Sequence, residues 1–275
     1  VDISKLEDDS IEGGYIIKID KPTGDGESCS TCYDDSFSFS SRYDTNGDIS
    51  DQSNIFFIYH YPKPDDISQD QRDYIQSVIF EFESVLLSEN NEELLNLIDL
   101  QSFIDFFIIN ELSKNPDGYR LSTFLNKDFN GKLKMGPIWD FNLAFANVDY
   151  CDGANPIGWI YNFNSICPGD IWQVPFWWEV LMQKEVFKTA LKNRWSSLRS
   201  SSLSNSTILN TIDSYTENLN SNNITNQNFY VWPVLGQYIW PNFFVGSTHE
   251  EEIEFLKSWI DDRLDWMDNE INSLN

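Results

Sequence analysis

Two short stretches of this chain decide how its fold is read: Asn115-Pro116-Asp117-Gly118-Tyr119-Arg120 and Gly136-Pro137-Ile138-Trp139-Asp140-Phe141-Asn142. Asp117 and Asp140 stand 23 residues apart. The segment between them, Leu121 to Met135, predicts two short strands around a turn at Phe129 to Lys132, because Asn-Gly readily adopts positive φ. A hairpin returns the chain to its starting point, so we expect both carboxylates at one end of it.

A structural reading of the two aspartates has to be weighed first. Asp-Gly is a common turn former, and a Trp-Asp pair can simply end a strand. Two aspartates among apolar neighbours such as Tyr119, Trp139 and Phe141 favour a site, because an unpaired carboxylate is costly to bury. Such a pair could hold a divalent cation and orient a hydroxyl, the two roles that phosphoryl transfer requires.

These stretches resemble a known protein family. Ser102 to Leu112, the motif around Asp117 and the motif around Asp140 are similar to the spore-coat protein H (CotH) kinase family. Further similar blocks follow the family order along nearly the whole chain: Gly13–Asp20, Val174–Trp177, Arg194–Arg199 and Leu256–Met267.

The resemblance implies an atypical protein-kinase-like fold and Mg²⁺-dependent transfer of phosphate from ATP to serine on coat or surface proteins. It implies that Asp117 is the catalytic base and Asp140 a metal ligand. Ser122 stands where many members have a metal-binding asparagine, and Asn142 stands where close relatives have an aspartate. Asn142 can ligate through its carbonyl oxygen but carries no charge, so one metal site is expected to be weaker.

The start of the chain departs from the family. Val1 to Leu6 resembles a point well inside it, so we expect this chain to be the C-terminal two-thirds of a longer protein. The upstream part of the family carries the basic residues that hold ATP phosphates. Lys18 and Lys21 are the loose candidates left for that role, although strand lysines are usually solvated.

The amino-acid composition limits the classes of partner that this protein can bind. The 275 residues include 44 acidic and 18 basic side chains, for a formal charge of −26. That balance argues against nucleic acid and permits metal cations and basic protein substrates. The 10 Trp, 12 Tyr and 20 Phe exceed what a disordered chain carries. No stretch reaches the roughly 18 consecutive apolar residues of a membrane span. The family implies an extracellular or cell-surface location with spore or coat association.

The four cysteines allow two readings. Cys29 and Cys32 have a C-x-x-C spacing, while Cys151 and Cys167 bracket a loop far along the chain. Zinc is possible on ligand count, but the two pairs are widely separated and only one has the C-x-x-C spacing. Disulfides, such as Cys151 with Cys167, are favoured in an exported protein.

The hydrophobic pattern predicts an α+β protein with a small β-rich part at residues 1–64 and a larger, mainly helical catalytic lobe at 65–275. The β-rich part would be the remnant of an N-terminal lobe, with strands at 14–19, 36–42 and 55–61. Asp44 to Asp51 resembles half a calcium loop, but a plain hairpin turn around Asn46-Gly47 fits better. We expect helices at 68–88, from Asp99 or Ser102 to about Lys114, and at 176–183, 185–199, 205–220 and 249–273.

A long loop from Asn147 to Pro175 follows the Asp140 motif. Its position suits an activation or substrate-binding segment, and loops of this length inside compact domains are often functional. An irregular loop held by a disulfide is an equally good reading.

Three alternatives to an active serine kinase remain open. A pseudokinase would explain Asn142 and the missing upstream segment. A non-catalytic surface module could bind protein or carbohydrate through exposed aromatic side chains, although four tryptophans are expected to be buried: Trp139, Trp195, Trp259 and Trp266. A metal-dependent hydrolase would need more His or Asp ligands than the chain offers near Asp117. The sequence leans towards an enzyme and leaves its oligomeric state open.

Overall fold

The computed structural model describes residues 11, 14–23 and 29–274. Val1 to Leu6 and Gly13, which contribute to the family resemblance, lie outside the described residues. The chain forms two compact units. Unit 1 contains Val1–Phe107, Asp117–Asp140 and Tyr161–Lys188, and unit 2 contains Ile108–Pro116, Phe141–Ile160 and Thr189–Asn275. The predicted boundary near residue 64 stays a prediction.

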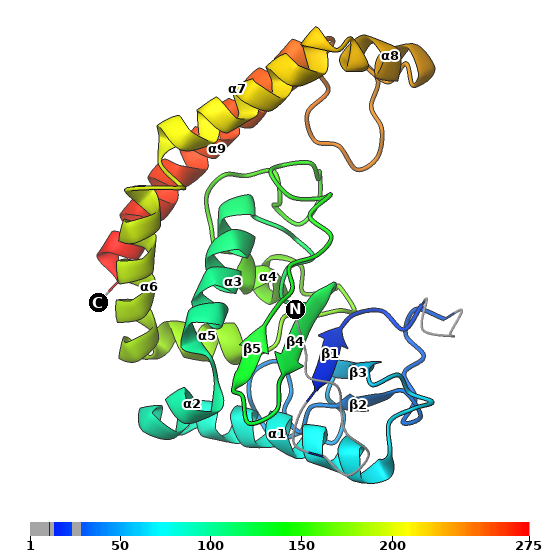
Figure 1. Ribbon diagram of the computed structural model, residues 1–275, viewed down its shortest axis with the longest axis vertical. Helices are drawn as coiled ribbons and strands as arrows, with labels where there is room; N and C mark the ends of the chain where they lie inside the picture. The colour runs from blue at the N-terminus through cyan, green and yellow to red at the C-terminus, as the bar shows by residue number, and fades with distance from the viewer. Residues whose placement is uncertain (1–10, 12–13, 24–28, 275) are drawn as a thin grey trace. The chain divides into compact units, whose positions relative to one another are not determined.

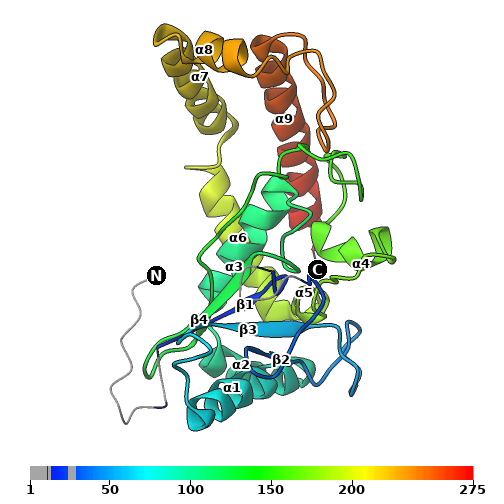
Figure 2. The ribbon, with the colours of Figure 1, turned by 90° about the vertical axis from the view of Figure 1, so that its right-hand side faces the viewer.

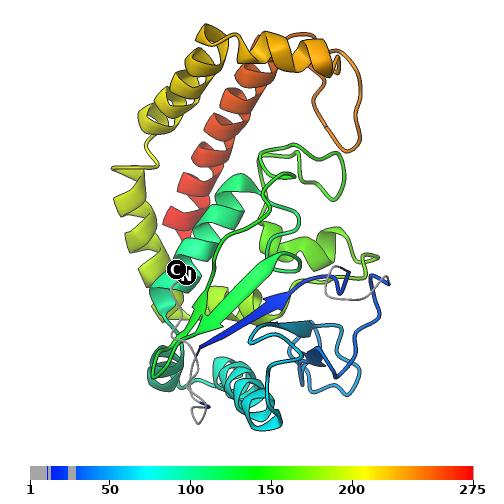
Figure 3. The same cartoon turned by 45° about the vertical axis from the view of Figure 1, so that its right-hand side comes forward.

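Unit 1 contains a five-stranded antiparallel sheet in the order β2-β3-β1-β4-β5. The strands are β1 (Tyr15–Ile19), β2 (Ser38–Ser40), β3 (Phe56–Tyr61), β4 (Thr123–Lys127) and β5 (Leu133–Met135). Figure 3 shows β1, in blue, beside β4, in green, and Ile17 pairs there with Leu125. The predicted hairpin is confirmed: β4 and β5 pair around a turn in which Asn130 has φ 49°.

Helix α1 (Gln69–Leu87) begins where the sequence predicts it. The Ser68 side chain accepts the Gln71 N–H, and the Gln71 side chain accepts the Ser68 N–H, so both ends of a capping box are made. The buried face of α1 includes Ile75, Ile79 and Phe82. Figures 1 and 2 both place α1 below β2 and β3, so this face covers one side of the sheet.

Shorter helices complete unit 1. They are α2 (Asn91–Leu97), α4 (Phe163–Ile166), α5 (Trp177–Gln183) and the first turns of α3 (Leu100–Ser113) and α6 (Glu185–Arg199), with the 3₁₀ turn η1 (Ile160–Asn162) before α4. The sequence predicts α3, α5 and α6 but not α2 or α4. Both missed helices are too short for an apolar period to show.

Aromatic rings form the core of unit 1. The Trp177 ring lies 5.0 Å from Phe82 and 5.7 Å from Phe57, joining α5 to α1 and β3. The Trp178 ring lies 5.8 Å from Phe106 and 4.5 Å from Tyr119. Such ring pairs add stability beyond the area they bury. Tyr119 lies two residues after Asp117, so its contact with Trp178 joins the aromatic core to the segment that contains Asp117.

Unit 2 is mainly helical. Its elements are α7 (Asn205–Ser221), α8 (Ile224–Val231), α9 (His249–Ser273) and the rest of α3 and α6. Lys257 on α9 pairs with Asp213 on α7 at 2.6 Å. Figure 2 shows α8 between the far ends of α7 and α9. The helix predicted at 249–273 is confirmed, and its apolar residues Ile260, Leu264 and Met267 are buried.

The tryptophan prediction is partly wrong. Trp195 and Trp259 are buried, and Trp266 is half-buried. Trp139 is 65% exposed. It lies beyond the end of β5, where the two-residue strand period no longer places side chains. The expected burial of Trp139 therefore no longer argues against an aromatic binding surface.

Two other readings are settled. Tyr43 and Ile49 form an antiparallel bridge around Gly47, whose φ is +87°, so the calcium-like stretch is a hairpin turn. Cys29 and Cys32 form a disulfide with an S–S distance of 2.09 Å, and Cys151 and Cys167 are disulfide-bonded too. Zinc is thereby excluded as their partner, since a thiolate must be free to bind it. Within the described ranges, no helix combines the length and apolarity that crossing a membrane demands.

Candidate active site

The backbone at Asp117 is held in place by a buried aromatic neighbour, Tyr119. The carbonyl oxygen of Asp117 accepts the Leu121 N–H, which closes a tight turn. Tyr119 lies inside that turn with φ 70° and is fully buried against Trp178. The Tyr119 hydroxyl donates to the Phe107 carbonyl at 3.3 Å. A bulky residue with positive φ needs surroundings that hold it, and positions of this kind gather at functional sites.

The Asp117 carboxylate is held by Arg120. Arg120 Nη2 donates to Asp117 Oδ1 at 2.8 Å, and Nη1 donates to Asp170 Oδ1 at 3.2 Å. Nη1 also reaches the Trp172 carbonyl at 3.2 Å, and the guanidinium lies 4.0 Å from the Phe163 ring. A planar guanidinium shared in this way fixes both carboxylates in direction.

Burial raises the pKa of the Asp117 carboxyl above its usual range. The positive charges of Arg120 and Lys21 oppose that shift, whereas the negative charges of Asp140 and Asp170 add to it. A carboxylate made more basic in this way is suited to accept a proton from a hydroxyl.

Asp140 stands at the other end of the β4–β5 hairpin. Gly136 N–H donates to the Phe124 carbonyl at 2.8 Å, which carries the chain back beside β4. Asp140 is exposed with φ 62°, and Ser122 has φ 49°. Ser122 Oγ donates to Asp140 Oδ2 at 3.3 Å. The hairpin therefore brings Ser122 beside Asp140, and the Asp140 charge acts on Asp117.

Asn142 is the third expected metal ligand. It is exposed and belongs to unit 2, where its backbone carbonyl oxygen accepts a hydrogen bond from the Asn147 side chain at 2.8 Å. Its role as a metal ligand stays a prediction.

The donor set suits Mg²⁺ that is shared with a nucleotide. Among the described residues, no three His, Cys, Asp or Glu side chains gather as a closed metal cage. Asp140 and Ser122 offer one carboxylate and one hydroxyl. Mg²⁺ is commonly bound by one or two carboxylates, with substrate phosphates and waters completing its octahedron. The chemistry of these donors therefore fits Mg²⁺.

The two candidate lysines differ in their surroundings. Lys18 is buried in β1 and its ammonium lies 3.6 Å from the Asp20 carboxylate. Lys21 is half-buried, with its ammonium 4.6 Å from the centre of the Trp172 ring, and its charge acts on Asp117. Lys21 is thus the lysine placed near the candidate base.

Sequence reasoning missed part of this arrangement. Arg120 belongs to the Asp117 motif, and its position three residues after the aspartate is the signal that could have identified their ion pair. Asp170 and Trp172 gave no local signal, because they reach Asp117 only through the fold.

The family described as CotH kinase protein matches residues 2–267. A comparison with curated proteins gives no match. The family match spans nearly all of the chain, including both aspartate motifs, and its description points to a kinase-like function. This chain belongs to the CotH kinase protein family.

Proposed function

We propose that this protein is a Mg²⁺-dependent phosphotransferase that moves the γ-phosphoryl group of ATP to a serine of a surface or coat protein. One observation carries the proposal: the Asp117 carboxylate is oriented by Arg120 and made more basic by burial, beside the charge of Asp140. A kinase site needs a base and a metal-holding aspartate in that relation.

Each residue has a chemical task in this reaction. Asp117 accepts the proton of the serine hydroxyl while the serine oxygen bonds to the γ-phosphorus of ATP. The bond from that phosphorus to the bridging oxygen breaks, and ADP leaves. Arg120 keeps Asp117 Oδ1 in one direction, so the proton acceptor needs no reorganisation. Asp140 and Ser122 would hold Mg²⁺, which neutralises charge on the phosphates, and Asn142 would assist.

The family suggests where the protein acts, and the charge suggests which substrates it attracts. We infer an extracellular or cell-surface location with spore or coat association. With a formal charge of −26, the protein would attract substrates whose acceptor serine lies among basic residues.

The test measures transfer of labelled γ-phosphate from Mg²⁺-ATP to serine on a panel of basic proteins. Asp117→Asn is expected to lower kcat by about 10²–10⁴-fold, the usual contribution of a general base. Asp140→Asn should abolish the Mg²⁺-dependent rate. Asp99→Asn is the matched control, because Asp99 is a half-exposed carboxylate of the same unit whose ion pair is Lys134 at 3.9 Å.

Transfer that survives in both site variants would remove these residues from the mechanism. No transfer and no Mg²⁺-dependent nucleotide binding, in this chain or in a longer parent protein, would favour a pseudokinase.

A non-catalytic surface module is the second candidate. Tyr230, Trp232, Tyr238 and Trp240 in unit 2 are all exposed. Aromatic faces of this kind stack on sugar rings or peptide groups. Binding to a glycan array that is lost in Trp232→Ala and Trp240→Ala, with no phosphotransfer by the intact chain, would favour this reading.

A further inference from the structure

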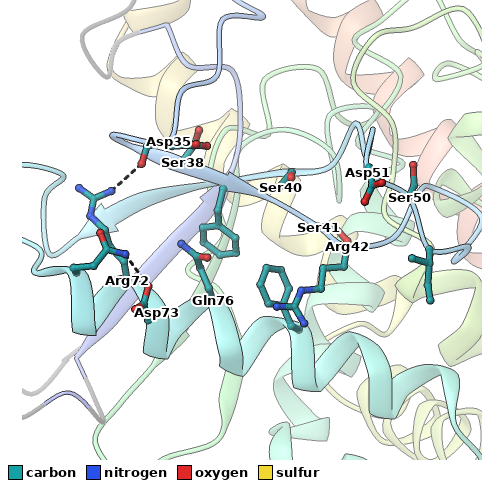
Figure 4. A pocket seen from close by; sticks show the side chains of 14 residues that line it. Asp35, Ser38, Ser40, Ser41, Arg42, Ser50, Asp51, Arg72, Asp73 and Gln76 are labelled. Atoms are coloured by element: carbon teal, nitrogen blue, oxygen red, sulfur yellow. Dashed lines mark hydrogen bonds between the residues drawn. The ribbon is translucent and has the colours of Figure 1, made fainter.

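A groove of about 730 Å³ lies on unit 1, between the edge strand β2 and helix α1. Figure 4 shows its two walls, with Asp35 and Arg72 towards one end and Ser50 and Asp51 towards the other. The α1 wall consists of residues that share one helical face: Gln69, Arg72, Asp73, Gln76 and Phe80. The opposite wall is the backbone and side chains of residues 38–42.

The β2 wall offers unpaired backbone groups. Ser41 N–H donates to Ile55 O and Tyr59 N–H to Phe37 O, so residues 37 and 41 turn their backbone groups towards β3. Antiparallel pairing alternates, and Ser40 therefore turns its N–H and C=O away from β3. Neither group has a partner within the described ranges. Ser40 is exposed and lines the groove.

The opposite edge of the sheet differs. On β5, Leu133 O accepts the Asp99 N–H at 2.9 Å, and Met135 N–H donates to Ser102 Oγ at 3.1 Å. Two of its outward backbone groups are therefore bonded by Asp99 and Ser102, at the start of α3. Proteins ordinarily cover or shorten their sheet edges in this way. The uncovered backbone at Ser40 is thus a local property of β2.

Arg42 supplies a second unmet group. Its guanidinium lies 3.9 Å from the centre of the Phe80 ring. No carboxylate or carbonyl of the described chain accepts a hydrogen bond from this guanidinium, which leaves a planar set of donors facing the groove. Arg72 differs, because it already donates to Asp35 O at 3.1 Å and to Pro64 O at 2.8 Å.

The mixed charge of the groove selects the class of ligand. Asp35, Asp51 and Asp73 line it along with the two arginines, so a free polyanion such as a nucleotide meets net negative walls. An extended peptide instead brings a C=O and an N–H to Ser40 and can place one carboxylate on Arg42. Ile49, which is 84% exposed at the rim, adds an apolar contact.

We propose that this groove binds an extended peptide segment of a partner protein, which carries a single acidic side chain for Arg42 and joins the sheet as a strand beside β2. Main-chain hydrogen bonds to Ser40 supply part of the affinity, and a peptide carboxylate on Arg42 fixes the register. The proposal does not depend on phosphotransfer and holds equally for a pseudokinase.

The test is selection of random dodecapeptides displayed on phage against the whole chain, followed by titration of the synthetic consensus peptide. We expect a consensus with an acidic residue at a fixed position. Ser40→Pro removes the outward N–H while leaving the β2–β3 ladder intact, since proline is tolerated at such edge positions. It should weaken binding roughly tenfold or more, the loss of one backbone hydrogen bond plus a steric clash. Ser40→Ala keeps the N–H and should bind like the wild type.

Two further measurements keep the result decisive. Arg42→Gln should weaken the consensus peptide but not a version with the acid replaced by its amide, while Lys134→Gln, on β5 at the other edge, should change neither. Peptide addition should also shift the Ser40 amide resonance in the wild-type protein and slow its hydrogen exchange, whether or not Ser40→Pro folds. The absence of any enriched peptide, equal binding by a folded Ser40→Pro, or an unmoved Ser40 amide would each overturn the proposal.

Discussion

Two buried arginines hold carboxylates in this protein, and their settings differ. Arg263 in unit 2 and its partner Glu111 both have side chains that are 0% exposed, with Nη2 3.2 Å from Oε2. Arg120 in unit 1 is 3% exposed, but its partners Asp117 and Asp170 are 19% and 26% exposed. One arginine is sealed together with its carboxylate, whereas the other presents its carboxylates to solvent.

The sealed arginine holds backbone in place. Arg263 also donates to the carbonyls of Pro156 and Gly158 at 2.9 and 2.7 Å. The buried Lys114 ammonium adds bonds to Asp152 and to the carbonyls of Asn155 and Ile157. Residues 152–158 of the long loop are therefore held by the buried side chains of Arg263 and Lys114. This favours the structural interpretation for this part of the loop.

The open arginine has a different consequence. It ties Asp170 and the Trp172 carbonyl to Asp117, so the later part of the loop lies beside the candidate base. The two readings of this loop, irregular connection and functional segment, thus divide along its length. The contrast indicates that removing the sealed arginine should affect stability, and removing the open one should affect activity.

The largest expected effect comes from Arg263→Leu. Glu111 would then stay buried after losing its ion pair with Arg263, and breaking a buried ion pair from one side typically costs about 3–5 kcal/mol of unfolding free energy. The double variant Arg263→Leu/Glu111→Leu should recover part of that loss, because an apolar pair of similar size leaves no charge unpaired. Urea unfolding of the three proteins measures both quantities. A double variant less stable than Arg263→Leu would show that the hydrogen bond that Glu111 accepts from the Ile160 N–H at 2.8 Å outweighs the unpaired charge.

Glu83 sharpens the comparison, because it is a sealed carboxylate held by neutral donors. Ser41 Oγ donates to its two oxygens at 2.8 and 2.9 Å, and Trp177 Nε1 donates at 3.1 Å. Burial raises the pKa of Glu83 to about 7. The folded state then holds this proton more tightly than the unfolded state, whose glutamate keeps a pKa near 4.5.

The direction of the pH effect on stability follows from this difference in the pKa of Glu83. The contribution of Glu83 to stability is complete below about pH 4.5 and is lost as pH rises towards about 7. The loss is on the order of 3 kcal/mol. Glu83→Gln removes it, so the stability of wild type relative to Glu83→Gln should fall between about pH 5 and about pH 8. Denaturant titrations at both pH values test this. A constant difference would mean that Glu83 stays ionised in the fold.

The open arginine is expected to act mainly on catalysis. Arg120→Gln removes the cation and the hydrogen bond that orient Asp117, and misplacement of a catalytic group commonly costs about 10–100-fold in kcat. Arg120→Lys keeps the charge but not the fork that reaches both carboxylates, so it should recover only part. Steady-state phosphotransfer gives kcat, with KM for ATP expected to change little. An unchanged kcat in Arg120→Gln would reduce Arg120 to a packing residue.

Local patterns predicted the parts of this molecule that local chemistry determines. The predicted helix start at residue 68 coincides with the Ser68 cap of α1, and Asn130-Gly131 predicted the turn that brings the hairpin back. The helix predicted at 249–273 agrees with α9 at both ends. These features depend on residues a few positions apart, so a single sequence contains them.

Features made by distant residues could not be predicted. Asp170 meets Arg120 only because the chain folds back after 50 residues, and no spacing rule relates the two. Trp139 shows the opposite failure, since an apolar side chain next to a strand ended up exposed. The open edge at Ser40 depends on which strand lies at the end of the sheet, and the sequence of a single strand does not determine the strand order.

The smallest predicted effect tests whether Asp170 competes with Asp117 for the open arginine. The Asp170 charge raises the pKa of Asp117, while Arg120 and Lys21 lower it. Asp170→Asn should therefore lower that pKa and move the acid limb of the pH–rate profile to lower pH. Stability should change by less than about 1 kcal/mol, since the pair is partly exposed. A limb that moves to higher pH would mean that the main task of Asp170 is to orient Arg120, because a displaced guanidinium would leave the base less well paired.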